Sequence, residues 1–182
     1  DINSIIAYIR SLAPIKTEVP ESVSDFPMNF IINTIPQKAN PQKIPLKSDA
    51  LAYGKYLVNA SACIECHSQV DKGKVIESLA YGGGREFAMP DGAVVRSANI
   101  TPDQQSGIGS WTEEIFVARF KAYADSAYTS PAVNKGEFNS VMPWMMYAQM
   151  NTEDLKAIYT YLKSVKAIEN KVQKFTPAKK SL

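Results

Sequence analysis

The stretch "SACIECHSQV", residues 61–70, contains both cysteines of the chain, Cys63 and Cys66, and its only histidine, His67. A C-x-x-C pair can form a redox-active disulfide, but such motifs follow a β-strand, and no run of β-branched residues precedes Cys63. A structural zinc site normally uses four cysteine or histidine ligands, and this chain offers three. These two interpretations therefore leave the motif incompletely explained.

The pattern C-x-x-C-H is also the attachment signal of a c-type haem. In such a site the thiols of Cys63 and Cys66 bond covalently to the haem, and the histidine that follows, His67, binds the iron. This use accounts for all three residues. The sequence therefore predicts one covalently bound haem c, with a redox dithiol or a zinc site as the remaining alternatives.

The composition is that of a soluble globular protein. Apolar residues make up 45% of the chain and charged residues 21%, and the net charge of +2 is too small to indicate a nucleic-acid partner. No apolar run approaches the roughly 18 residues needed to cross a bilayer, and no signal-peptide pattern is visible. Because the sequence begins at Asp1 without a methionine, we expect a processed chain or a piece of a longer protein.

The first half of the chain predicts two helices joined by a long connector. Residues 2–12 have apolar side chains at helical spacing, and a second helix is expected from an N-cap at Ser48 to about Ala60. Between them, residues 14–47 contain six of the eleven prolines, which favour extended backbone. We expect this connector to lie across a surface, held there by Phe26, Phe30, Ile31 and Ile32.

The second half predicts two further helices after an irregular stretch at residues 71–110. Thr112 is the expected N-cap of one helix, which continues to about residue 125, with Trp111 and Phe116 placed for a hydrophobic staple. The last helix opens at Thr152 and presents an apolar stripe to the core, made of Leu155, Ile158, Tyr159, Leu162 and Val165. An irregular stretch as long as 71–110 is typical of a chain that wraps around a large ligand.

The two ends of the chain repeat one pattern. Residues 1–15, "DINSIIAYIRSLAPI", align without gaps with residues 154–168, "DLKAIYTYLKSVKAI". We predict that the first segment is the closing helix of a preceding, similar domain, so that the parent protein carries at least two haem domains in tandem. The chain then divides into a helix (1–13), a connector (14–47), a main domain (48–168) and a tail (169–182).

Because His67 is the only histidine, no second histidine of this chain can bind the iron, and the sixth position is left to methionine, an occasional lysine or tyrosine, water, or no ligand. Methionine is the usual choice, and four of the six methionines lie in "SVMPWMMYAQM", residues 140–150. Most of these are expected to fill the core. Met142 differs because Pro143 stiffens its backbone, which favours Met142 over Met89, Met145 and Met146.

Four stretches together resemble class I c-type cytochromes, and most closely the cytochrome domains that accompany membrane-bound bacterial dehydrogenases of alcohols, aldehydes and sugar acids. The resemblance covers about residues 48–168 and is carried by "YGKYLVNASACIECH" (53–67), "YGGGREF" (81–87), "NITPDQQSGIGSWTEEIF" (99–116) and "VMPWMMYAQMNTEDLKAIYTYLKSV" (141–165).

This resemblance implies an all-α fold, the class I cytochrome c fold, in which the first and last helices cross beside the haem. It also implies that the methionine of the Met-Pro pair before the last helix, here Met142, binds the iron. The extra Met-Pro pair in "FAMPDG" departs from the family pattern and keeps Met89 as an alternative. Further candidate residues at the cofactor are Arg85, Arg96, Asn99, Trp111, Trp144 and Tyr147, and Thr101 is expected to shape the loop with Asn99.

Iron bound by His67 and Met142 has no open position for a substrate, so we expect one-electron transfer and not catalysis. The expected partners are a dehydrogenase or quinol-linked donor and an acceptor such as another cytochrome or a terminal oxidase, with a preceding haem domain of the parent chain as a further partner. The alternative is a haem enzyme or a ligand-responsive sensor with a displaceable sixth ligand. The resemblance implies a periplasmic location or the extracytoplasmic face of a bacterial membrane, in a membrane-associated complex.

Overall fold

A computed structural model describes residues 1–134 and 136–179 of the chain, which form two units that divide between Gln42 and Lys43. The first unit contains α1 (Ile2–Ser11), α2 (Met28–Ile31) and a 3₁₀ turn, η1 (Ile32–Thr34). Every residue of α1 is exposed. The apolar residues expected to fix the connector to a surface, Phe26, Phe30, Ile31 and Ile32, are exposed within this unit.

The second unit contains α3 (Ala50–Ala60), α4 (Cys63–His67), α5 (Glu113–Lys121), α6 (Trp144–Tyr147) and α7 (Thr152–Ser164). The N-cap of α3 is Asp49, whose carboxylate accepts a hydrogen bond from the Ala52 amide, and not Ser48 as the sequence suggested. Thr112 caps α5 as predicted and accepts from the Ile115 amide. The helix ends four residues earlier than expected, at Lys121.

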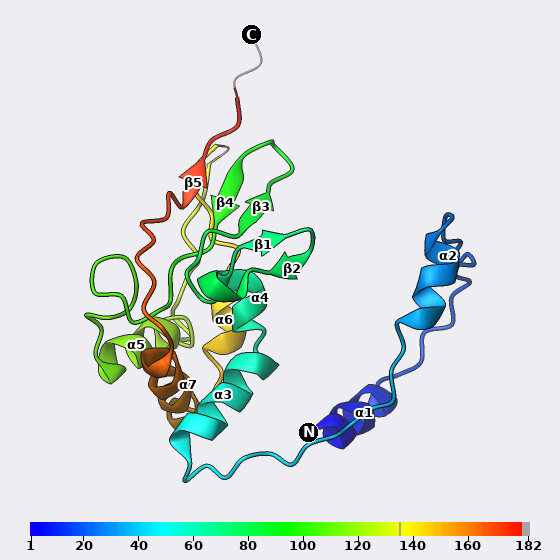
Figure 1. The fold of residues 1–182 in the computed structure, drawn as a ribbon, viewed down its shortest axis with the longest axis horizontal. Helices are drawn as coiled ribbons and strands as arrows, with labels where there is room; N and C mark the ends of the chain where they lie inside the picture. Colours follow the sequence, from blue (N-terminus) through cyan, green and yellow to red (C-terminus); the bar gives the residue numbers. More distant parts are fainter. Residues whose placement is uncertain (135, 180–182) are drawn as a thin grey trace. The chain divides into compact units, whose positions relative to one another are not determined.

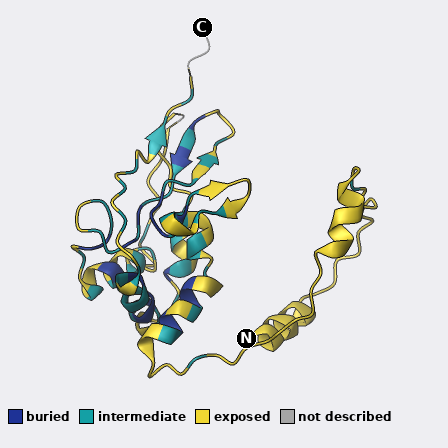
Figure 2. Cartoon of the chain, viewed as in Figure 1, coloured by how far each residue is buried: buried dark blue, intermediate teal, exposed yellow. Residues whose placement is uncertain are grey.

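The core of this unit forms where α3 crosses α7, and these two helices lie side by side in Figure 1. A glycine allows the close approach, because a Cβ atom on Gly54 would lie 2.0 Å from the Ala157 carbonyl oxygen. Figure 2 shows the buried faces of both helices turned toward each other. Their fully buried side chains include Val58, Leu155 and Leu162. The predicted apolar stripe of α7 is therefore confirmed as core.

The prediction of an all-α fold is wrong, because the second unit also contains two small antiparallel sheets. One pairs β1 (Val70–Asp71) with β2 (Lys74–Val75) across a two-residue turn. The other has the order β3-β4-β5 and is made of β3 (Glu86–Ala88), β4 (Val94–Arg96) and β5 (Phe175–Thr176). A short 3₁₀ turn, η2 (Glu77–Leu79), separates the two sheets along the chain.

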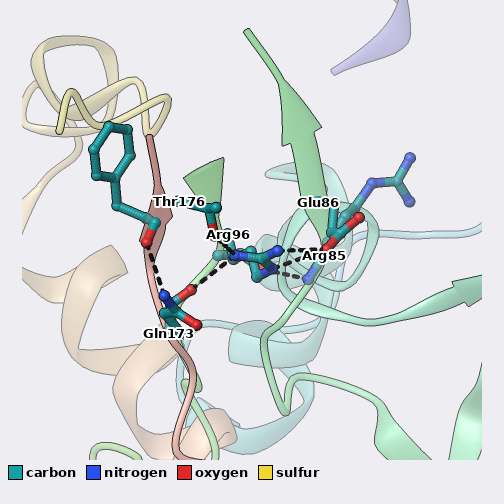
Figure 3. Close-up of polar contacts among 7 residues, drawn as sticks. Arg85, Glu86, Arg96, Gln173 and Thr176 are labelled. Atoms are coloured by element: carbon teal, nitrogen blue, oxygen red, sulfur yellow. Dashed lines mark hydrogen bonds and ion pairs between the residues drawn. The ribbon is translucent and has the colours of Figure 1, made fainter. Parts of the chain in front are cut away.

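Arg96 ties the three-stranded sheet together from its central strand (Figure 3). Its guanidinium forms an ion pair with Glu86 of β3 at 2.8 Å and donates to the Thr176 hydroxyl of β5, also at 2.8 Å. It donates as well to the Gln173 carbonyl. The segment expected to be a tail thus supplies the third strand of the sheet; residues 180–182 of that segment lie outside the described part.

Within residues 1–134 and 136–179, none of the helices combines the length and the apolar character that a membrane-spanning helix requires.

Candidate functional site

Both cysteines and the histidine lie on α4, which starts directly after α3 ends. Ala62, whose φ of 53° is in the left-handed region, interrupts the helical backbone between α3 and α4. Cys63 and His67 are half-buried, whereas Cys66 is exposed. The five-residue helix therefore presents the three groups of the C-x-x-C-H motif from one short, fixed element.

The ring of His67 is oriented by a backbone carbonyl. Nδ1 lies 2.7 Å from the oxygen of Ala98, and because a carbonyl can only accept, Nδ1 carries the proton. The lone pair of the ring is then on Nε2, the nitrogen available to a metal. Burial, the larger influence, lowers the pKa of His67, while the Ala98 carbonyl acts in the opposite direction. A low pKa keeps the imidazole neutral, as a metal ligand must be.

A glycine loop packs between the backbone of His67 and the backbone of Ala98. The Gly83 amide donates to the carbonyl of His67 at 2.7 Å, and Gly83 has a φ of +73°. A Cβ atom at this position would lie 2.5 Å from the Ala98 carbonyl carbon, so only glycine fits between the two segments. The loop "YGGG" thus fixes the backbone that carries the His67 ring and the backbone whose carbonyl orients it.

The loop after Ala98 is held by Asn99, whose side chain is buried. Its amide nitrogen donates to the Ser106 hydroxyl and to the Ile168 carbonyl, and its oxygen accepts from the amide and hydroxyl of Thr101. Every polar atom of this side chain is therefore engaged by the protein. Asn99 acts on the site by fixing the loop, and Ile168 connects that loop to the chain that follows α7.

The segment that carries Met142 is tethered to the end of α3. The Tyr147 hydroxyl, on α6, donates to the Ser61 carbonyl at 2.8 Å, two residues before Cys63. Burial is the largest cause of the raised pKa of Tyr147, and the nearby thiols of Cys63 and Cys66 act in the same direction. Figure 1 shows α6 beside α4. The structure thus brings Tyr147, five residues after Met142, close to the C-x-x-C-H helix.

A cytochrome c family profile matches residues 51–166, well over half of the chain. The chain belongs to the cytochrome c family. The chain is 36% identical over 115 residues to a gluconate 2-dehydrogenase cytochrome c subunit of Pantoea cypripedii, a match that covers 63% of this chain and 23% of that protein. It is 32% identical over 123 residues to the cytochrome c subunit of a quinone alcohol dehydrogenase of Gluconobacter oxydans, a match that covers 65% of this chain and 22% of that protein.

A third relative, a fructose dehydrogenase cytochrome subunit of Gluconobacter japonicus, is 30% identical over 132 residues, covering 71% of this chain and 24% of that protein. The chain therefore spans less than a quarter of the length of these relatives. The family match confirms the expected resemblance and the cofactor: the protein binds haem c covalently and belongs to the electron-transfer cytochromes.

The side chains of the C-x-x-C-H motif fit this cofactor. The neutral imidazole with its lone pair on Nε2 suits an iron ligand. Burial, with Cys66 beside it, raises the pKa of the Cys63 thiol to about 11, which disfavours the thiolate that a redox dithiol or a zinc site would need. Among residues 1–134 and 136–179, no three His, Cys, Asp or Glu side chains are grouped to hold a metal ion. The zinc alternative therefore lacks a ligand set.

The other methionines occupy different surroundings in this cytochrome. Met89 lines a separate cavity of about 260 Å³ together with Val133, Phe175 and their neighbours, and no residue of the C-x-x-C-H motif contributes to that cavity. Met145 and Met146 on α6 are 59% and 76% exposed. Met142, in contrast, is half-buried and lies two residues before α6, the helix whose Tyr147 hydroxyl donates to the Ser61 carbonyl.

The remaining predicted residues are distributed over the cytochrome c domain. Trp144 and Tyr147 lie on α6, close to Met142, whereas the backbone carbonyl of Trp111 accepts from the Tyr159 hydroxyl on the α5–α7 side of the core. Arg96 is engaged by the three-stranded sheet, and the Arg85 side chain points away from that cluster in Figure 3. Several contacts at the site had no sequence signal, since the carbonyls of Ser61 and Ala98 are backbone groups that any residue provides.

Proposed function

We propose that the domain transfers single electrons through a haem c whose iron is bound by His67 and Met142, within a dehydrogenase complex. The observation that carries the assignment of Met142 is the hydrogen bond from Tyr147 to Ser61, because it holds Tyr147, five residues after Met142, close to Cys63 and Cys66. Met89 lines a cavity to which no residue of the C-x-x-C-H motif contributes. The local backbone also supports Met142, since Ser140 and Trp144 hydrogen-bond to it on both sides.

Bound haem c supplies a one-electron couple, and a histidine–methionine ligand pair favours the reduced form. The protein's part is to fix the ligands and to limit solvent. Ala98 keeps the proton of His67 on Nδ1, and Gly83 locks the backbone that carries the ring. Tyr147 and Pro143 hold the methionine segment stiffly, so that the side chains move little between the two oxidation states. Small structural change is what rapid electron transfer requires.

Replacement of Met142 tests this assignment. The haem-loaded protein is expected to show the weak long-wavelength absorption band of thioether-bound ferric iron, and Met142→Ala should abolish it while covalent haem attachment persists. Met89→Ala is the matched control, since it removes the other methionine of a Met-Pro pair, and should leave the band intact. Loss of the band in Met89→Ala with retention in Met142→Ala would contradict the proposal. Rapid binding of cyanide or carbon monoxide by the wild type would favour the enzyme or sensor alternative.

The relatives support the nature of the partners. Three of them are named as cytochrome subunits of gluconate, alcohol and fructose dehydrogenases, the second of these a quinone enzyme. We propose that this domain accepts electrons from such a dehydrogenase or from a quinol, and passes them to another cytochrome or a terminal oxidase. Its place is then the periplasm or the extracytoplasmic face of the membrane. Co-purification of the full-length parent protein with a dehydrogenase, and reduction of its haem by that enzyme's substrate, is the direct test.

We also propose that residues 1–13 are the closing helix of a preceding haem domain. Supporting this, Ile2, Ile5 and Ile9 of α1 align with Leu155, Ile158 and Leu162 of α7 and have the same amphipathic spacing. A chain that spans 22 to 24% of its relatives is compatible with further domains in the parent protein. A parent sequence without a C-x-x-C-H motif upstream of Asp1 would rule the proposal out.

A further inference from the structure

One charged side chain that contacts Trp144 has no part in the site described so far. Arg119 lies on α5, is exposed, and places its guanidinium 4.6 Å from the centre of the Trp144 ring and 5.5 Å from that of Tyr123. The rings of Tyr123 and Trp144 stack at 5.1 Å with an interplanar angle of 9°. Phe120 packs on the same indole at 5.3 Å. The Trp144 indole is therefore contacted by one cation and two aromatic rings, which come from the last turn of α5 and from the residues just after it.

Trp144 is in turn linked rigidly to Met142. The Trp144 amide donates to the carbonyl of Met142 at 2.8 Å. The indole Nε1 of Trp144 and the amide of Met142 both donate to the hydroxyl of Ser140, each at 3.2 Å. A displacement of the indole must therefore disturb the backbone of Met142. Pro143, which lies between the two residues, leaves little freedom to absorb such a shift.

The same helix also holds the far end of the segment. Lys121, the last residue of α5, donates from Nζ to the carbonyls of Ala148 and Met150, just beyond α6. The contacts of Arg119 and Lys121 thus bracket the chain from Met142 to Met150. Of these two residues, only Arg119 contacts the part of the segment next to Met142, the proposed ligand.

We propose that Arg119 is a positioning residue for Met142: by contacting the stacked rings of Trp144 and Tyr123 together, it holds the indole in place and keeps the methionine sulfur where the iron needs it. This inference rests on the proposed assignment of Met142 as an iron ligand. Arg119 contacts neither ligand itself and acts through the indole. Loss of the Arg119 contacts should let Met142 dissociate from the iron more often. The thioether band would then weaken, and external ligands could reach the iron.

The test compares three variants of the haem-loaded, full chain. Arg119→Ala is expected to weaken the thioether band and to raise the rate of cyanide binding about two- to fivefold, the range that an exposed cation–π contact supports. Arg119→Lys keeps a cation over the rings and should restore most of the wild-type behaviour. Arg10→Ala, the matched control, removes an exposed arginine from the last turn of α1 in the first unit and should leave band and rate unchanged.

Hydrogen exchange separates positioning from a charge effect. In Arg119→Ala the amides of Met142, Trp144 and Tyr147 should exchange faster, whereas Arg10→Ala should not affect them. A lowered reduction potential with unchanged exchange and an unchanged band would overturn the proposal, because the charge alone would then explain the result. If Met142→Ala abolishes the band and Arg119→Ala leaves all readouts at wild-type values, the ligand assignment stands and this inference fails. If Met142→Ala leaves the band intact, both fail.

Discussion

Helices α1 and α7 share one sequence pattern but differ completely in burial. Ile2 of α1 aligns with Leu155 of α7, and the two side chains are 65% and 0% exposed. Ile9 and Leu162 show the same contrast, at 59% and 2%. An amphipathic pattern therefore specifies which face a helix can bury, and a partner helix decides whether it does. For α7 that partner is α3, which crosses it at Gly54.

The largest effect is expected from truncating the aligned pair Leu155 and Ile2. Leu155→Ala leaves a cavity in the fully buried core and should lower the free energy of unfolding by about 3 kcal/mol. Ile2→Ala removes an exposed side chain and should change it by less than about 0.5 kcal/mol. Denaturant titration of the haem-loaded protein measures both. Equal losses in the two variants would mean that α1 is buried in solution.

The same pair of substitutions can sharpen the comparison in a longer chain. If a preceding haem domain covers α1 in the parent protein, Ile2→Ala should become costly there, approaching the loss expected for Leu155→Ala. If Ile2→Ala remains without effect in the parent protein, the proposed origin of residues 1–13 is contradicted.

A somewhat smaller effect is expected at the crossing point of α3 and α7. Gly54→Ala would place a methyl group 2.0 Å from the Ala157 carbonyl oxygen, so the helices must separate. We expect a loss of about 2 kcal/mol from this overpacking, even though alanine favours the helix more than glycine does. Asn59→Ala, at an exposed position of the same helix, is the control and should be nearly neutral. A stabilised Gly54→Ala variant would show that the crossing is looser than the structure indicates.

The contrast between the two helices also explains what the sequence could predict. Helical periodicity and the N-cap Thr112 located the longer helices closely, because those signals are local. The strands β1 to β5 are two or three residues long, too short for a period, and β4 pairs with β5 from about 80 residues away. At the site, "CIECH" predicted the cofactor because its chemistry resides in side chains. The hydrogen bond of His67 to the Ala98 carbonyl and the contact of Arg119 with Trp144 are tertiary contacts, which no local sequence pattern predicts.

The smallest effect is expected from the polar contact at the start of α7. The Tyr53 hydroxyl on α3 donates to the Asp154 carboxylate at 3.1 Å, and Lys47 pairs with the same carboxylate at 3.5 Å. Tyr53→Phe keeps the buried ring and removes only the hydrogen bond, so we expect a loss of about 1 kcal/mol in the free energy of unfolding. Combining it with Asp154→Asn in a double-mutant cycle isolates the coupling of the two side chains. Strictly additive losses would mean that this contact contributes nothing to the pairing of α3 with α7, and that apolar packing alone distinguishes α7 from α1.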